Sequence, residues 1–329
     1  MDTLDWLRDA DPTVPNAARA YNYAIGEPHN LHADRQFAED IHQASGRTFL
    51  AEAQANRAFV LDTVRTLSHD AGIRQFLDIG CGVPTRTNAH DAAPHADIVY
   101  VDIDPVVVGH CRHLWSGHPR IGVIHGDVRQ PEQILRHPDV TARLDLTQPI
   151  GVLLGAVLDF VADPGDAAGI LTQLAAAAAP GSYLALSHSL VTSRNIAQQD
   201  RVRRLFRQTA TPLYPRTAAQ LHTILDGWSR TEPNLNPITH WHPEPLHLDR
   251  HAPIGAIAIV ARNRPCRSRP PAGPCQGSRP PRPETADPAP ASAPLAPVTH
   301  CDDDGPAAAQ HSRHRKMFCV SMQDVGTSP

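Results

Sequence analysis

The chain has 329 residues, of which 41% are hydrophobic and 19% charged, and its formal net charge is −4. Its one lysine is Lys316, which excludes chemistry that needs a P-loop lysine, a Schiff-base lysine or a lysine base in the body of the chain. Residues 1–263 carry 22 Lys/Arg against 28 Asp/Glu, a balance that disfavours nucleic acid as a partner and suits a neutral or cationic small ligand.

The N-terminus is acidic and has neither the basic nor the apolar region of a signal peptide. The longest apolar run, 150–157, is far shorter than the roughly 18–20 residues of a membrane helix, so we expect no membrane partner. Six cysteines without a CxxC pair are typical of free thiols, and we expect a cytoplasmic protein. His110 and His113 lie one helical turn apart, but no second ligand pair at finger spacing accompanies them, so we expect no metal site.

The N-terminal part of the chain has a helical pattern. Apolar residues recur at intervals of three and four between Leu31 and His69, and Gly72 ends the pattern. We therefore predict a helical N-terminal extension over residues 1–70.

A different pattern follows, in which short apolar runs alternate with helix-compatible stretches such as 105–115 and 166–179. Runs that are apolar on both faces indicate buried parallel strands. Residues 71–263 are thus predicted to form an α/β domain with one doubly wound sheet, whose strands lie within 75–79, 98–101, 121–124, 149–154, 183–186 and 254–261.

After residue 263 the composition changes to a mixture rich in proline and arginine, with 13 of the 32 prolines in residues 264–329. Such a segment has few aliphatic side chains to bury, and we predict a disordered C-terminal tail. A shifted reading frame in a GC-rich gene would produce the same composition, and this remains the alternative explanation.

The first strand ends in a motif that predicts a ligand site. Asp78 is followed by Gly80, Cys81 and Gly82, and the two glycines allow a tight turn and a close approach to a ligand. In a doubly wound sheet, ligands bind beyond the carboxyl ends of the strands beside the first one.

Two later strands also end in carboxylates. Asp102-Ile103 closes the second strand, where an acid can accept hydrogen bonds from the two hydroxyls of a ribose. Asp127-Val128 follows the third strand and is placed to receive an adenine amino group. The ordered set of glycine turn and two strand-end acids predicts adenosine recognition.

Thr85 occupies the third position of a GxGxxG pattern, and Pro84 before it has no N–H to donate. A dinucleotide needs such donors for its pyrophosphate, whereas S-adenosylmethionine carries a sulfonium and an ammonium that suit Asp78 and Asp102. The motif therefore favours S-adenosylmethionine as the cofactor.

The chain resembles the class I S-adenosylmethionine-dependent methyltransferases, and more closely an actinobacterial family of them once catalogued as a domain of unknown function, DUF574. The resemblance covers about residues 18–262. The matching stretches are ARAYNYAIGEPHNLHADR (18–35), ANRAFV (55–60), IRQFLDIGCGVPT (73–85), VYVDIDPVV (99–107), AVLDFV (156–161), PGSYLALSH (180–188) and TPLYPRT (211–217).

This resemblance implies a seven-stranded Rossmann-like methyltransferase sheet, with the donor over the turn at 80–82, its ribose on Asp102 and its adenine at Asp127-Val128. It also implies a methyl acceptor, for which we expect a small molecule. The chain departs from the family at Glu27-Pro28, where a Gly-Lys-like pair is typical, and at Asp159, where a histidine is common. These changes leave donor binding expected and put turnover in question.

Other residues have two interpretations each. Asp159 and His188 lie at strand ends and could act as a general base or simply face the cleft. Tyr21, Tyr23, Asp34 and Arg35 could cover the donor or pack between helices, and the basic cluster at 201–207 could attract an anion or be solvated.

The leading hypothesis is a methyltransferase that aligns donor and acceptor for in-line displacement, without an assigned catalytic residue. The alternatives are a non-catalytic S-adenosylmethionine-binding regulatory protein and an NAD-dependent oxidoreductase. No motif in the sequence specifies the acceptor or the oligomeric state.

Overall fold

A computed structural model describes residues 11–207, 209–230, 235–241 and 255–263. These residues all belong to one compact unit, Met1–Pro271. Residues 264–329, for which the sequence predicts disorder, lie outside the described residues.

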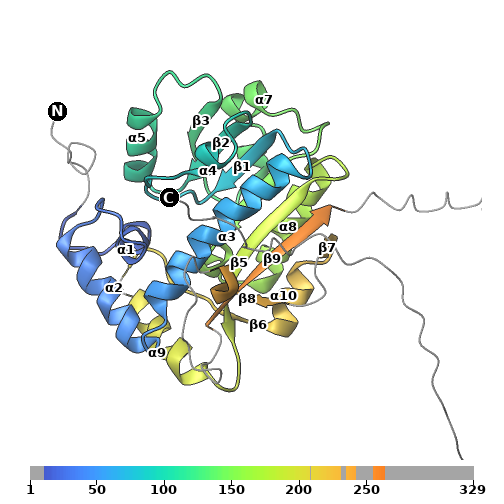
Figure 1. The fold of residues 1–329 in the computed structure, drawn as a ribbon. Helices are drawn as coiled ribbons and strands as arrows, with labels where there is room; N and C mark the ends of the chain where they lie inside the picture. The colour runs from blue at the N-terminus through green and yellow to red at the C-terminus, as the bar shows by residue number, and fades with distance from the viewer. Residues whose placement is uncertain (1–10, 208, 231–234, 242–254, 264–329) are drawn as a thin grey trace, which may run out of the picture. The chain divides into compact units, whose positions relative to one another are not determined.

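A mixed sheet forms the centre of this unit (Figure 1), and its main path has the order β3-β2-β1-β4-β5-β9-β7. Strands β1 to β5 are parallel along this path, whereas β9 is antiparallel to both of its neighbours. The short strands β6 and β8 pair with β5 and β9 off this path. The bounds are β1 (Gln75–Ile79), β2 (Asp97–Asp102), β3 (Ile121–His125), β4 (Gly151–Gly155), β5 (Tyr183–Val191), β6 (Arg216–Thr217), β7 (Trp228–Arg230), β8 (Asn236–Pro237) and β9 (Ala256–Asn263).

The predicted doubly wound sheet is therefore confirmed, and each predicted apolar run overlaps a strand, although β5 and β9 extend beyond the predicted ends. All five residues of β1 are buried, as expected for a central parallel strand covered on both faces. The strand β7 lies in none of the predicted runs and completes the seven strands of the main path.

Helices cover both faces of the sheet. Their bounds are α1 (Ala17–Ala24), α2 (His32–Ala44), α3 (Phe49–His69), α4 (Ala89–Ala92), α5 (Pro105–Leu114), α6 (Pro131–Leu135), α7 (Pro138–Arg143), α8 (Pro164–Ala177), α9 (Ile196–Phe206) and α10 (Ala218–Ile224), with short 3₁₀ helices η2 (Leu158–Phe160) and η3 (Ile238–Trp241). Leu77 and Ile79 face a core that includes α6, α7, α8 and α10, whereas Phe76 packs with α3 and α4. None of the helices within the described residues is long and apolar enough to span a bilayer.

A third apolar cluster joins α1 and α2 to α9, which comes from much later in the chain. Phe37 of α2 stacks edge-on against Phe206 of α9 with ring centroids 5.1 Å apart. Figure 1 shows these three helices grouped beside the start of α3. They form a helical layer next to the carboxyl ends of the strands.

Candidate functional site

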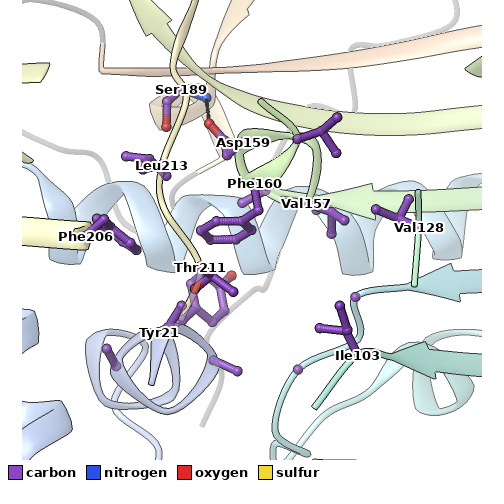
Figure 2. A pocket seen from close by; sticks show the side chains of 18 of the residues that line it. Tyr21, Ile103, Val128, Val157, Asp159, Phe160, Ser189, Phe206, Thr211 and Leu213 are labelled. Carbon is purple, nitrogen blue, oxygen red and sulfur yellow. Dashed lines mark hydrogen bonds between the residues drawn. The ribbon is translucent and has the colours of Figure 1, made fainter. Parts of the chain in front are cut away.

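A cavity of about 820 Å³ lies at the carboxyl ends of β1, β2, β3 and β4 and is bounded on its other side by α1, α3 and α9 (Figure 2). It adjoins the boundary between β1 and β4, where the strand order reverses. All the residues predicted to bind the cofactor line it: Asp78, Gly80, Cys81, Gly82, Asp102, Ile103, Asp127 and Val128.

The turn after β1 needs its glycines for two different reasons. Gly80 and Gly82 both have a positive φ, of 72° and 67°. A Cβ on Gly80 would lie 2.4 Å from Cγ2 of Val157, whereas nothing lies within 4 Å of a Cβ on Gly82. Gly80 thus permits close packing, and Gly82 leaves open space beside the cavity.

Asp102 is buried at the end of β2 and is held by the backbone. Its Oδ2 accepts a hydrogen bond from the N–H of Gly82 at 2.8 Å, and its Oδ1 accepts one from the N–H of Asp104 at 2.9 Å. Burial raises the pKa of Asp102 to about 6, although these backbone hydrogen bonds oppose the rise. A carboxylate oxygen can accept a second hydrogen bond, so both oxygens remain available to a ligand's hydroxyls.

Asp104 is the N-cap of α5, as its position before Pro105 suggests. Its Oδ1 accepts a hydrogen bond from the N–H of Val106, and its Oδ2 accepts one from Nδ2 of Asn16, each at 2.8 Å. Asn16 is itself the N-cap of α1. One side-chain hydrogen bond therefore joins the caps of two helices at the rim of the cavity.

Asp78 lies next to Asp102 in the cavity wall and is 7% exposed. Burial raises its pKa to about 7, the positive charge of Arg57 opposes the rise, and Asp102 adds to it. Arg57 comes from α3, and its Nη2 donates to the carbonyl of Thr87 at 2.6 Å and to Oγ1 of Thr85. The arginine therefore fixes the loop after the glycine turn while facing the acid.

Asp127 has a partner that the sequence did not predict. Arg129 donates to both carboxylate oxygens of Asp127, from Nε at 2.9 Å and from Nη2 at 2.6 Å. Burial would raise the pKa of Asp127, but these hydrogen bonds outweigh it and lower the pKa below its usual value. Val128 is partly buried and packs against the apolar core.

Cys81, between the two glycines, is partly buried. Its thiol contacts that of Cys111, and this hydrogen bond together with burial raises the pKa of Cys81 well above its usual value. The thiolate, which is the nucleophilic form, is therefore disfavoured.

Both ring nitrogens of His188 lie next to polar groups of the protein. Arg216 donates from Nη1 to Nε2 of His188 at 2.7 Å, so the lone pair of that nitrogen is already engaged. The other ring nitrogen, Nδ1, lies 2.8 Å from the carbonyl of Ser189 and 3.3 Å from Oδ1 of Asp159. The side chain of His188 is fully buried, and the residue lies inside β5 rather than at its end as the sequence predicted.

Asp159 does line the cavity, as Figure 2 shows. Its Oδ1 accepts the backbone N–H of Ser189 at 2.9 Å. Its Oδ2 is buried and accepts no hydrogen bond within the part of the chain that the structure describes. The other departure from the family pattern is Glu27-Pro28. The carboxylate of Glu27 accepts a hydrogen bond from the N–H of Arg86 at 3.2 Å, in the loop that follows the glycine turn.

Of the four residues considered as a cover for the donor, Tyr21 lines the cavity, and its hydroxyl donates to the carbonyl of Ala53 at 3.1 Å. Tyr23 instead donates to Glu39 at 2.9 Å. Asp34 is fully buried and accepts Nε of Arg19 at 2.7 Å, and Arg35 donates to the carbonyl of Asn30. These last three residues pack the helical layer. The basic cluster is solvated, because its arginines on α9 and just after it are exposed.

One face of α3 forms a wall of the cavity that the sequence analysis did not assign. Its members are Phe49, Glu52, Asn56, Arg57 and Val60. The spacing of Phe49, Glu52, Asn56 and Val60 by three or four residues was visible in the sequence, but it indicated only a buried helix face. A polar residue at such positions is the signal that could have distinguished a cavity wall from core.

Comparisons with known proteins agree with this geometry. A family model described as S-adenosyl methyltransferase matches residues 6–264. A crystal structure of a protein from Thermobifida fusca that is assigned as a methyltransferase is 33% identical, with a TM-score of 0.70, covering 77% of this chain and 96% of that one. A DUF574 family protein from Streptomyces avermitilis is 32% identical, also with a TM-score of 0.70, covering 78% of this chain and 99% of that one. No curated protein matches this chain.

Proposed function

The chain belongs to the S-adenosyl methyltransferase family, and from this premise we propose that it transfers a methyl group from S-adenosylmethionine to a small-molecule acceptor in the cavity at the carboxyl ends of β1 to β4. The observation that carries the proposal is the pair of buried acids, Asp78 and Asp102, beside the open space at Gly82. The cofactor is cationic, and its sulfonium supplies a methyl group that is already activated.

The residues of the cavity fit this cofactor. Asp102, held in place by the N–H groups of Gly82 and Asp104, would accept the ribose hydroxyls. Asp78 would face the ammonium group, since an unpaired carboxylate in a buried wall gains most from a positive partner. Ile103, which is 45% exposed, and Val128 would contact the adenine, with Asp127 near its amino group.

The chain's own contribution to catalysis would be positioning. The acids fix one reactant, the helical layer of α1, α2 and α9 shields it from water, and the two reactants need only be aligned. Since Nε2 of His188 is engaged by Arg216, this pair offers no free base to the acceptor.

Two observations bear on the alternatives. An NAD-dependent oxidoreductase would need N–H groups at a helix start for the pyrophosphate, but the helix after the glycine turn, α4, begins only at Ala89 and has four residues. A non-catalytic S-adenosylmethionine-binding protein would share the donor site, so only a measurement of turnover separates it from an enzyme.

The test of the donor site is Asp102→Ala. Loss of the ribose acceptor should weaken S-adenosylhomocysteine binding by about tenfold or more, because hydrogen bonds to a charged group contribute roughly 1.5–3 kcal/mol. Asp97→Ala, on the exposed beginning of the same strand, is the control and should leave the affinity unchanged. Equal affinities of both variants in calorimetry would refute the assignment of Asp102. Turnover is tested by S-adenosylhomocysteine formation from labelled donor and a metabolite extract.

A further inference from the structure

The cavity extends beyond the region assigned to the donor. Its far part lies under the helical layer and is walled by apolar side chains: Ile41, Phe49, Phe160, Val202, Phe206 and Leu213. Figure 2 shows Phe160, Phe206 and Leu213 on the side away from Ile103 and Val128. The apolar walls of this part of the cavity suit a second, largely apolar reactant.

Glu52 is an acid in these surroundings, where the uncharged polar residues Ser45, Gln199 and Thr211 also line the cavity. It projects from the first turn of α3 between Phe49 and Asn56 and lines the cavity. Its polar neighbours are Thr48 and the N–H of Gly255, which both lower its pKa, and the hydroxyl of Thr48 donates to the carbonyl of Ser45 at 3.2 Å. A Cβ on Gly255 would lie 2.3 Å from Oε1 of Glu52, so the glycine leaves the space that the carboxyl occupies. The position of this acid is therefore defined by its neighbours.

Glu52 has no basic partner among the described residues. Within the described ranges, no ion pair within 4 Å involves Glu52 and no charged side chain contributes to its pKa, which burial raises to about 7. The two arginines that line the cavity are engaged elsewhere, Arg57 with the loop at Thr85 and Thr87, and Arg129 with Asp127. A carboxylate held in an apolar wall without a cation is stabilised by any cation that enters.

The other acids of the cavity wall differ from Glu52 in this respect. Asp127 is paired with Arg129, Asp104 caps α5, Asp159 lies beside His188, and Asp166 is exposed on the first turn of α8. Asp78 and Asp102 belong to the proposed donor site. Glu52 is thus the acid in the apolar part of the cavity that is left for a ligand.

We propose that Glu52 determines acceptor specificity by binding the ammonium group of a small amine whose apolar body lies against Phe49, Phe206 and Leu213. The proposal deepens the proposed function and rests on it. Two further features agree with a cationic acceptor: residues 1–263 carry an excess of acids, and Oδ2 of Asp159, in the cavity wall, accepts no hydrogen bond from a described residue.

The experiment compares amines with the alcohols that replace their amino group. Butylamine, cyclohexylmethylamine, phenethylamine and tryptamine are each titrated against their matched alcohol by calorimetry, on the full chain saturated with S-adenosylhomocysteine. At least one amine should bind about tenfold or more tightly than its alcohol, the ratio expected for one charge-assisted hydrogen bond. If no amine exceeds its alcohol, the proposal is overturned.

Two variants test whether the preference for amines over alcohols depends on Glu52. Glu52→Gln keeps the size of the side chain and should reduce the amine-to-alcohol ratio to within about twofold, since only the charge is lost. Glu132→Gln, on the exposed helix α6, is the matched control and should keep the wild-type ratio. A Glu52→Gln protein that retains the ratio would overturn the assignment.

The affinity for S-adenosylhomocysteine distinguishes a failure of the proposed function from a failure of the role of Glu52. It is measured first on each protein and also reports whether Glu52→Gln folds. Wild-type protein that fails to bind S-adenosylhomocysteine refutes the proposed function, and with it this proposal. Protein that binds S-adenosylhomocysteine but shows no amine preference refutes the role of Glu52 alone. If Glu52→Gln does not fold, the wild-type amine-to-alcohol ratios still decide whether the acceptor is an amine.

Discussion

Gly80 and Gly82 are two residues apart and share a left-handed backbone, but their surroundings differ. Gly80→Ala should lower the free energy of unfolding by about 2–4 kcal/mol, because the strained φ and the clash with Val157 add together. Gly82→Ala should cost only about 1–2 kcal/mol, from backbone strain alone, but should weaken donor binding, since its Cβ would project into the space beside Asp102. Urea denaturation and calorimetry measure the two effects. Equal stability losses would contradict this division of roles.

Asp78 predicts a pH effect on stability. Burial first, and then Asp102, raise its pKa to about 7 against 3.8 in the unfolded chain, although Arg57 opposes the rise. The folded protein therefore favours the protonated acid, and stability is lost as the pH increases from about 4 to about 7. Asp78→Asn removes this loss, so the stability advantage of the variant should grow over that interval and then level off. Thermal unfolding at a series of pH values measures it, and an advantage that is the same at pH 4 and pH 8 would contradict the assignment.

The sequence predicted the residues of the site whose positions follow from local geometry. Asp78, Gly80, Gly82, Asp102 and Asp127 all lie at strand ends, and the parallel sheet places those ends side by side. Their role in binding the donor stays a prediction. The partners of these residues could not be predicted, because they depend on distant contacts, such as that of Arg57 with the loop at Thr85.

At the scale of elements, the buried pair Arg19–Asp34 joins α1 to α2. The side chains are 5% and 0% exposed, and Asp34 also accepts the N–H groups of Asn16 and Leu31. Asp34→Asn should therefore cost about 3–5 kcal/mol, the penalty of leaving a buried charge without its partner. The control is Asp62→Asn, which breaks the exposed pair with Arg65 and should change stability by about 0.5 kcal/mol or less.

The stability of both variants is measured by denaturation, which is followed by limited proteolysis of the helical layer. A loss for Asp34→Asn no larger than that for Asp62→Asn would show that the pair is dispensable for packing α1 on α2.

Elements with a strong periodic pattern were predicted, and those stabilised by distant pairing were not. The sequence runs that form β1 to β5 and β9 are apolar and bounded by turns, so the local sequence was enough to predict these strands. The strand β7 has three residues, and its register with β9 is set by a partner more than 30 residues away in the chain. The helix α1 lies before Leu31, where the periodic apolar pattern begins, and its N-terminus is capped by Asn16.

For the whole molecule, the fold predicts where the chain can be shortened. Asn263, at the end of β9, donates from Nδ2 to the carbonyls of Ala175 and Ala178, and its N–H donates to Ser182, so the sheet is tied to α8 up to this residue. A protein ending at residue 264 should therefore keep the donor affinity and the melting temperature of the full chain. Calorimetry and thermal unfolding compare the two proteins, and a weaker or less stable short form would assign a structural role to residues 265–329.

The hydrogen bond between Asn16 and Asp104 has a consequence for communication across the cavity. The N–H of Asp104 donates to the carboxylate of Asp102, and the carboxylate of Asp104 accepts a hydrogen bond from Nδ2 of Asn16. Oδ1 of Asn16 in turn accepts the N–H of Arg19 in α1. A nucleoside bound to Asp102 would thus reduce the mobility of the first turn of α1, the helix that helps to enclose the adjoining part of the cavity. Amide hydrogen exchange in α1 should slow when S-adenosylhomocysteine is added, and an Asn16→Ala protein should lose that response. A single amide side chain would then couple occupation of the nucleoside site to the mobility of α1.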